Sequence, residues 1–581
     1  MTQLNPQQIL ALPREQAELS LNQLPLEEQT SLVLLAPWEK RHDIILLSHH
    51  SRELVQSMPV EELFWTIKAI GTQDALHLLG LATPQQIQFF LDLDLWYKDK
   101  LRPDKIAGWL LLLNESDPNA LSAWIYLCHS RDQWLIPAML RMFITVQKRA
   151  DDMDIQEAKD ILPPFSLDNN YFIGFKKQEL QPIIANFIYK LLQVSPGLYR
   201  DTLETILTET PGETLEHAYR LRKARLSDWG IPDYYDSLSI YAELLPDQVR
   251  RVPLSDPPPL SDDMPAVPAF IPTLYIEEDY PFLQEALQGI AGTPAMERVL
   301  WEWAGTANKL LMADLVDLDE PEILKHTLFK AAALLNLGLE LLHYTKGLDP
   351  ITILRESVIE DLVRVANTSV KALSAQVNEL VEQGLIPPNL SHIPEDFLPF
   401  IKGLLQDRPG IFVENEAQIK AFARILELEE AQKVIKSLKA LAKAAEAIPP
   451  GWKNWKTRIA WENTNMLNPQ ELSFDKGLLT ALAQASLDNA LVVVPVEENA
   501  LQKLKALWQN KDEFQTRTKN FLQKLSKEKN INLEILIEAS INAYLKLNQE
   551  WQGVCDQELS GRFITMLLIE INNKHIANKS K

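Results

Sequence analysis

The sequence contains very little cysteine. Only two cysteines, Cys128 and Cys555, occur among its 581 residues. Two thiols cannot form the disulfide network that stabilises small secreted domains, and a chain of this length can bury a large core without one. We therefore expect both cysteines to be reduced and to pack like small apolar side chains.

Long apolar runs are also lacking. The best ones are Ile106–Leu113 and Ala331–Leu342, and the second contains Asn336 and Glu340. Both are much shorter than the roughly 18 apolar residues of a membrane-spanning helix. The amino terminus lacks the basic segment and apolar run of a signal peptide. We therefore expect a cytoplasmic protein without a membrane span.

Positive charge is in short supply. The chain has 57 lysines and arginines against 79 aspartates and glutamates, which gives a formal net charge of −22. A chain with this charge repels the phosphate backbone of nucleic acids at long range. We expect an acidic protein that does not bind nucleic acid nonspecifically.

The common catalytic motifs are absent as well. The sequence has no GxSxG elbow, no phosphate loop ending in GK[ST], no HExxH and no CxxC. His42 and His49 would share a face of one helix, but packed or surface histidines explain them better than a metal pair. We assign no catalytic residue, metal or cofactor, and we lean towards a protein that is not an enzyme.

What the sequence does contain is a repeat of prolines near its amino terminus. Pro13, Pro25 and Pro37 are twelve residues apart, and Pro59 and Pro84 follow at about twice that spacing. Acidic residues follow the first four, as in Leu24-Pro25-Leu26-Glu27-Glu28. Proline suits the first helical position, and acids favour the positive end of the helix dipole. The spacing predicts short helices that must stack on their neighbours, as in a solenoid.

This leucine–proline–acid spacing, over about residues 8–95, resembles the helical superhelix in the cytoplasmic amino-terminal domain of MgtE-type magnesium transporters. The resemblance implies a fold and not transport, because the transporter's membrane domain has no counterpart in this sequence. Three further blocks resemble an uncharacterised bacterial family that has no assigned activity: Gln88–Asp94, Tyr171–Phe175 and Trp229–Tyr234.

The rest of the chain predicts a mainly α fold. Extended structure is expected only near 171–175 and 491–496, where aromatic or β-branched residues cluster. A capping box at Thr210 and Glu213 predicts a helix that runs to about Leu226. An apolar-rich stretch at 121–146 is also expected to be helical. Further helices are expected at 281–290, 294–316, 320–346, 350–384, 394–407, 415–447, 470–488, 497–527 and 531–573.

Seven prolines between 253 and 272 predict a linker, because proline removes backbone donors and fixes φ. The predicted segments are a superhelix at 1–160, a helical domain with a short β element at 161–252, the acidic linker at 253–272, a helical domain at 273–450 and a helical region at 451–575.

The most distinctive functional candidate is a cationic and aromatic segment at 217–241. Its candidate binding residues are Arg220, Arg222, Lys223, Arg225, Trp229, Tyr234 and Tyr235. Guanidinium groups beside aromatic rings can bind phosphate or carboxylate groups. The alternative is that these cations pair with the chain's many acids while the aromatic rings pack the helix against its neighbours.

Two functions follow from these observations. The first is an intracellular scaffold or regulatory protein that binds a protein partner through its repeated helices. The second is an anion-binding sensor or an enzyme that uses residues 217–241. Missing motifs do not exclude an enzyme, because active sites assemble from residues distant in sequence.

Overall fold

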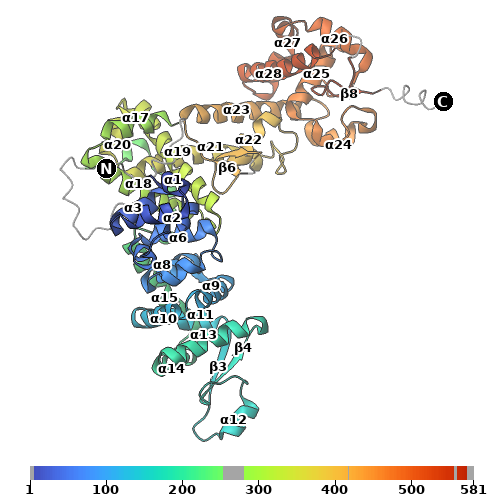
Figure 1. The fold of residues 1–581 in the computed structure, drawn as a ribbon. Coiled ribbons are helices and arrows are strands. Elements are labelled where there is room, and N and C mark those ends of the chain that lie inside the picture. The colour runs from blue at the N-terminus through green and yellow to red at the C-terminus, as the bar shows by residue number, and fades with distance from the viewer. Residues whose placement is uncertain (1–4, 253–279, 416–417, 555–558, 572–581) are drawn as a thin grey trace. The chain divides into compact units, whose positions relative to one another are not determined.

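The computed structural model describes residues 5–252, 280–415, 418–554 and 559–571 (Figure 1). In these residues the chain is mainly α-helical, with eight short strands in four two-stranded sheets. The predicted fold class is therefore confirmed. Cys555 and the predicted linker at 253–272 lie outside the described residues.

Two compact units make up the chain. Unit 1 comprises residues 1–242, 248–332 and 348–364, and unit 2 comprises residues 243–247, 333–347 and 365–581. Each unit is thus assembled from three separate stretches of sequence. The five segments expected from the sequence stay a prediction.

Short helices at the start of the chain form the first part of unit 1. They are α1 (Pro6–Ala11), α2 (Arg14–Asn22), α3 (Leu26–Leu35), α4 (Trp38–Ile45), α5 (Ser51–Ser57), α6 (Val60–Ile70), α7 (Leu76–Leu81) and α8 (Pro84–Asp94). Contacts repeat between each helix and the one two places along, from α3 with α5 to α6 with α8. These local, repeated interfaces are those expected of a superhelix.

The prolines begin these helices, but four of them sit one residue earlier than expected. Pro13, Pro25, Pro37 and Pro59 are N-caps with extended ψ values between 138° and 154°. Of the five prolines in the repeat, only Pro84 is the first residue of its helix. The reason is that an N-cap's N–H makes no intrahelical bond either, so proline costs the helix no hydrogen bond there.

The remainder of unit 1 is built from longer helices and two small sheets. The helices are α9 (Pro103–Ser116), α10 (Pro118–Arg131), α11 (Leu135–Arg141), α12 (Ile155–Ile161), α13 (Gln181–Val194), α14 (Pro196–Thr208), α15 (Pro211–Asp228), α16 (Tyr234–Ser237), α17 (Pro281–Ile290), α18 (Pro294–Ala313) and α20 (Pro350–Glu356). The strands are β1 (Trp96–Tyr97), β2 (Lys100–Leu101), β3 (Ile144–Lys148) and β4 (Tyr171–Phe175). Helices α19 (Pro321–Lys346) and α21 (Ile359–Glu382) are divided between the units.

The strand expected at 171–175 is confirmed as β4, but its partner was missed. Strand β3 pairs antiparallel with it, from Ile144 opposite Phe175 to Lys148 opposite Tyr171. The apolar stretch at 121–146 had been expected to be helical throughout. Strand β3 forms there because β4 supplies backbone hydrogen bonds from a distant part of the chain.

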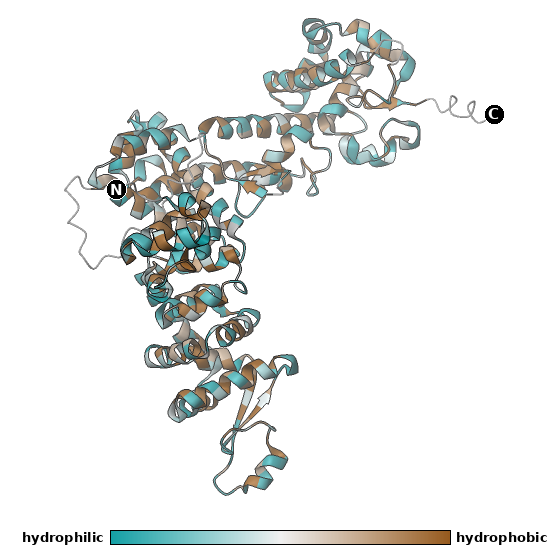
Figure 2. Cartoon of the chain, viewed as in Figure 1, coloured by the Kyte–Doolittle hydropathy of each residue, from teal (hydrophilic) through white to brown (hydrophobic). Residues whose placement is uncertain are grey.

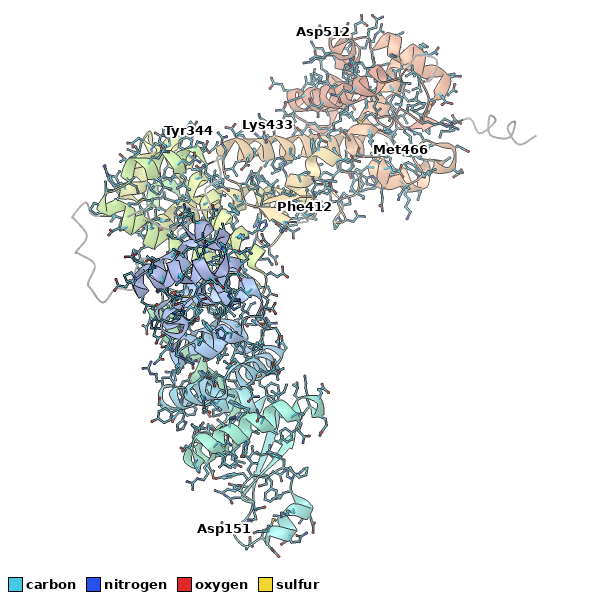
Figure 3. All side chains as sticks on the ribbon, viewed as in Figure 1. Asp151, Tyr344, Phe412, Lys433, Met466 and Asp512 are labelled. Carbon is cyan, nitrogen blue, oxygen red and sulfur yellow. The ribbon has the colours of Figure 1, made fainter. Side chains whose placement is uncertain are left out.

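Unit 2 contains a set of four helices that pack against one another: α23 (Ile425–Ala447), α25 (Phe474–Asp488), α27 (Lys511–Lys529) and α28 (Leu533–Gln552). The smaller elements are α22 (Leu398–Leu404), α24 (Trp455–Arg458), α26 (Leu501–Leu507), β5 (Ile411–Val413), β6 (Gln418–Lys420), β7 (Val496–Glu497) and β8 (Ile569–Glu570). Figure 2 shows hydrophobic and hydrophilic residues on the same helices, as expected of amphipathic helices. Lys433 is exposed on α23 (Figure 3).

Several expected helices in unit 2 are shorter or replaced. Residues 418–420 are strand β6, paired with β5, where a helix had been expected from 415. The strand expected near 491–496 is also shorter than expected. Residues 491–495 are irregular, and only Val496–Glu497 pairs, in parallel with β8. These strands are two or three residues long, so period-two alternation is too short to detect in the sequence.

Candidate functional site

Helix α15 carries the four predicted cations, and its pattern decides which of them is buried. The N-cap of the helix is Thr210, whose side chain forms the predicted capping box with Glu213. Its buried residues are Thr214, Ala218, Arg222 and Leu226, each four positions after the last. Residues four apart share one face of a helix, so Arg222 occupies the face that packs into the protein.

Arg222 is buried without a carboxylate partner. Its side chain is 2% exposed, and its Nε donates to the backbone oxygen of Asp92 at 2.6 Å. The guanidinium carbon lies 5.4 Å from the ring centre of Trp96. Among the described residues, Nη1 of Arg222 has no hydrogen-bond partner. Burial lowers the pKa of Arg222 to about 10, although the nearby charge of Asp92 opposes this.

Arg225, in contrast, is fully paired. It donates to both carboxylate oxygens of Asp92, at 2.6 and 2.7 Å, and to Asp132 at 2.9 Å. Burial raises the pKa of Asp92 and of Asp132, and the hydrogen bonds from Arg225 oppose this rise. A bidentate pair of this kind fixes the position of all three side chains.

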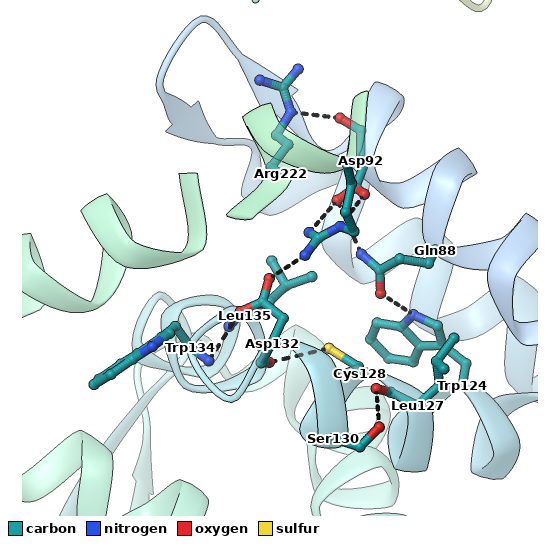
Figure 4. Close-up of polar contacts among 11 residues, drawn as sticks. Gln88, Asp92, Trp124, Leu127, Cys128, Ser130, Asp132, Trp134, Leu135 and Arg222 are labelled. Atoms are coloured by element: carbon teal, nitrogen blue, oxygen red, sulfur yellow. Dashed lines mark hydrogen bonds and ion pairs between the residues drawn. The ribbon is translucent and has the colours of Figure 1, made fainter. Parts of the chain in front are cut away.

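The hydrogen-bond chain continues away from Arg225 (Figure 4). Gln88 donates to Asp92 at 3.0 Å and accepts from the indole N–H of Trp124 at 2.9 Å. Cys128 lies 3.6 Å from the backbone oxygen of Asp132, and burial raises the pKa of its thiol well above the usual value. The thiol is therefore protonated at neutral pH.

The two remaining cations lie at the surface. Arg220 pairs with Glu216 at 2.8 Å, and Lys223 pairs with Asp236 at 2.8 Å. Their side chains are 68% and 43% exposed. Such pairs match the alternative in which cations of this segment neutralise nearby acids.

The three predicted aromatic residues do not form one cluster. Trp229 packs edge-on against Phe89, with ring centres 5.7 Å apart. Tyr234 lies beside Tyr235 at 5.2 Å, and the Nζ of Lys98 lies 4.7 Å from the ring centre of Tyr234. The structure thus brings Arg222 and Tyr234 to one cavity and Arg225 and Trp229 to another.

The cavity at Arg222, here called the Arg222 cavity, has a volume of about 190 Å³. Its lining combines polar and aromatic residues (Asp94, Trp96, Tyr97, Lys98, Arg102, Arg222, Tyr234 and Asp317) with apolar ones (Leu93, Leu311, Met312, Leu315, Val316 and Leu318). Trp96 is 7% exposed, and its indole N–H also lacks a partner among the described residues. Two residues that line this cavity, Arg222 and Trp96, therefore each carry a buried donor without an acceptor in the described part of the chain.

Sequence reasoning missed the contribution of residues 96–102. This stretch holds Trp96, Tyr97, Lys98 and Arg102, a second combination of cations and aromatic rings. It forms the turn around strands β1 and β2, where Lys98 has a left-handed φ of 58°. The combination of cations and aromatic rings in this stretch was a signal of a binding site. The sequence of the stretch, however, did not indicate that this turn contacts α15.

The cavity beside Arg225 is larger, about 440 Å³, and is lined by the paired network, including Asp92, Cys128 and Asp132. Because the polar groups of that network bond to one another, they leave little capacity to bind a ligand.

The largest cavity described lies in unit 2 and measures about 850 Å³. His392 borders it and bonds through Nδ1 to the backbone oxygen of Leu472 at 2.8 Å. Lys546 also borders it and pairs with Asp396 at 2.7 Å and with Asp475 at 3.4 Å. Burial lowers the pKa of His392, so the ring is neutral at pH 7. The mixture of charges indicates no particular ligand.

No group of three metal-ligating side chains occurs in the described part of the chain. His49 bonds to Glu18 at 2.9 Å, and the ring of His42 is partly buried, where burial lowers its pKa. No helix among the described residues is long and apolar enough to cross a membrane.

Comparison with known proteins places the chain in a family. A family model described as a family of unknown function, DUF6178, matches residues 18–570. The chain belongs to the DUF6178 family. This agrees with the resemblance of three sequence blocks to a family without an assigned activity. A search of curated proteins and a search of solved structures found no match to this DUF6178 chain.

Proposed function

We propose that this DUF6178 chain binds a small anionic ligand in the Arg222 cavity of unit 1. The observation that supports the proposal is that two residues lining the cavity, Arg222 and Trp96, each carry a buried N–H donor without an acceptor among the described residues. A buried donor without a partner costs about 1–3 kcal/mol, and more when it is charged. An anion in the cavity removes this cost and neutralises the guanidinium.

The neighbouring acids do not meet this need. The carboxylate of Asp92 is held by Arg225, and Arg222 reaches only its backbone oxygen. Asp94 accepts from Lys68 at 2.9 Å and from the indole N–H of Trp109 at 2.6 Å. Within the described part of the chain, Arg222 therefore forms no ion pair.

The test compares Arg222→Met with Arg220→Met in thermal melts of the full chain, with and without millimolar acetate, benzoate or inorganic phosphate. We expect at least one anion to raise the melting temperature of the wild type and of R220M, but not of R222M. Without ligand, R222M should change stability by less than about 1 kcal/mol, because removing an uncompensated buried cation offsets the lost hydrogen bond.

R220M is the matched control because Arg220 lies on the same helix but is exposed and paired with Glu216. An equal response to anions in R222M and the wild type would contradict the proposal. So would a wild type that responds to none of the three anions.

A protein-binding scaffold, the first function expected from the sequence, stays a prediction and is compatible with a ligand site. The short helices α1–α8 provide a repeated surface for a partner. The cytoplasmic location and the resemblance of residues 8–95 to the MgtE-type superhelix are also retained as proposals.

A further inference from the structure

We infer that the ligand of the Arg222 cavity is a small monocarboxylate with an apolar or aromatic body, and not inorganic phosphate. This inference rests on the proposed function and specifies its ligand class. It follows from the apolar wall, the charge balance, the donors and the size of the cavity.

The apolar wall of the cavity begins at the end of helix α18. Leu315 has a left-handed φ of 52°, a conformation that usually requires glycine. Its N–H bonds to the oxygen of Met312 at 3.4 Å, and that of Val316 bonds to Leu311 at 3.3 Å. This is the Schellman arrangement, with leucine in the position normally taken by glycine. The turn places Leu315 and Val316 among the lining residues. Part of the apolar wall therefore lies on a turn with a strained backbone conformation.

The charges around the cavity suit a single negative charge. Lys98, Arg102 and Arg222 line it together with Asp94 and Asp317, which leaves a formal excess of one positive charge. A phosphate group carries between one and two negative charges at pH 7. Its second charge would lie near Asp94 and Asp317, whereas a carboxylate adds only one.

The donors and the aromatic rings also suit a carboxylate. The guanidinium carbon of Arg222 lies 5.4 Å from the ring centre of Trp96, and each of these two side chains has an N–H group without a partner among the described residues. Two neighbouring donors can each bind one oxygen of a planar carboxylate. The apolar body of the ligand then contacts leucine, methionine and valine side chains. These side chains offer no hydrogen bonds to replace the ones that a phosphate makes with water.

The size of the cavity limits the ligand. A volume of about 190 Å³ equals that of about six water molecules in the liquid, at ~30 Å³ each. An acid with one ring fits this space. A second, apolar cavity of about 40 Å³ shares Leu93, Leu311 and Leu318 with it. We therefore expect the apolar end of the ligand to lie against these three leucines, which line both cavities.

The experiment measures the affinity of the full chain for three probes by calorimetry: benzoate, its neutral analogue benzamide, and inorganic phosphate. We expect benzoate to bind at least tenfold more tightly than either of the others. Benzamide has the same shape but no charge, so it reports on Arg222. Phosphate has the charge but no apolar body, so it reports on the apolar wall.

A second variant tests the apolar wall without disturbing the backbone. Asparagine tolerates a left-handed φ, so Leu315→Asn should fold. We expect L315N to weaken benzoate binding several-fold while leaving acetate binding unchanged, because acetate has almost no apolar body. R222M should remove binding of both acids.

The outcomes separate this inference from the proposed function. If phosphate binds through Arg222 and benzoate does not, the ligand class is wrong and the anion site stands. Equal binding of benzoate and benzamide, or benzoate binding that survives R222M, overturns both. Benzoate binding that is unchanged in L315N overturns the role of the apolar wall and, with it, the assigned ligand class.

Discussion

At the scale of single residues, Arg222 and Arg225 show how two similar side chains acquire different roles. They are three residues apart on α15, and both contact Asp92. Arg225 donates hydrogen bonds to the carboxylate of Asp92, whereas Arg222 donates only to its backbone oxygen. The carboxylate holds Arg225 in the hydrogen-bond network, whereas Arg222 lines a cavity and keeps a donor without a partner among the described residues.

Replacing Arg225 should therefore destabilise the protein strongly. Arg225→Met leaves the carboxylates of Asp92 and Asp132, each 1% exposed, without their cation. Breaking a buried pair from one side costs about 3–5 kcal/mol. Urea unfolding of R225M and the wild type measures the difference, with R220M as the control expected to lose less than about 1 kcal/mol.

The cost of R225M should depend on pH in a defined direction. Burial already raises the pKa of both aspartates in the folded protein, and removing Arg225 raises it further. When the pKa of a carboxyl group is higher in the folded than in the unfolded protein, the folded state becomes less stable as the pH rises from the unfolded-state pKa to the folded-state pKa. R225M should thus be less stable at pH 7 than at pH 5, relative to the wild type. A deficit that is the same at both pH values would show that the aspartates are not responsible.

At the scale of elements, packing rather than helix propensity decides several positions. Gly477 lies in helix α25, and a Cβ there would be 2.5 Å from Cη2 of Trp455, which is fully buried. Gly108 lies in α9, where a Cβ would meet no atom within 4 Å. The same substitution therefore meets opposite environments in two helices.

We predict opposite effects for alanine at these positions. Alanine adds about 1 kcal/mol of helix propensity over glycine, whereas overpacking a well-packed core costs about 1–3 kcal/mol. Gly477→Ala should lower the free energy of unfolding, because the added methyl group overlaps the fully buried ring of Trp455. Gly108→Ala should raise it by about 0.5–1 kcal/mol. Chemical denaturation of both variants checks this, and a G477A protein as stable as G108A would refute the packing argument.

The helix start predicted at Thr210 is confirmed because it depends on local chemistry. Its capping box involves residues three positions apart, and it is present. Strand β3 was missed because its hydrogen bonds come from Tyr171–Phe175, more than twenty residues later. A pattern read within one segment has no information about a partner strand that lies elsewhere.

At the scale of the whole molecule, the sequence on both sides of residues 253–272 belongs to unit 1. Lys68 pairs with Asp319 at 2.5 Å, and Tyr241 donates to Asp314 at 2.6 Å, so contacts join the two sides. A cut in the chain between them would therefore leave those contacts intact.

This division predicts the result of limited proteolysis. A protease that cuts after acidic residues should cleave first between 253 and 272, as expected for a proline-rich linker, whereas trypsin has no site between Arg251 and Arg298. The two fragments should elute together from a sizing column under native conditions and separate only in denaturant. Fragments that separate without denaturant would show that the two sides form independent domains.

The sequence by itself determined the helical class, the capped helix start at Thr210 and the absence of a membrane-length apolar run. These properties depend on side chains within about one helical turn of each other, or on one continuous run of residues. Tertiary structure alone decided which arginine of α15 is buried without a carboxylate. The Arg222 cavity joins α15 to the turn at Trp96–Arg102 and to the end of α18 at Leu311–Leu318. Burial and the loss of solvent arise only when such distant segments meet, and they convert an ordinary helical cation into a candidate binding group.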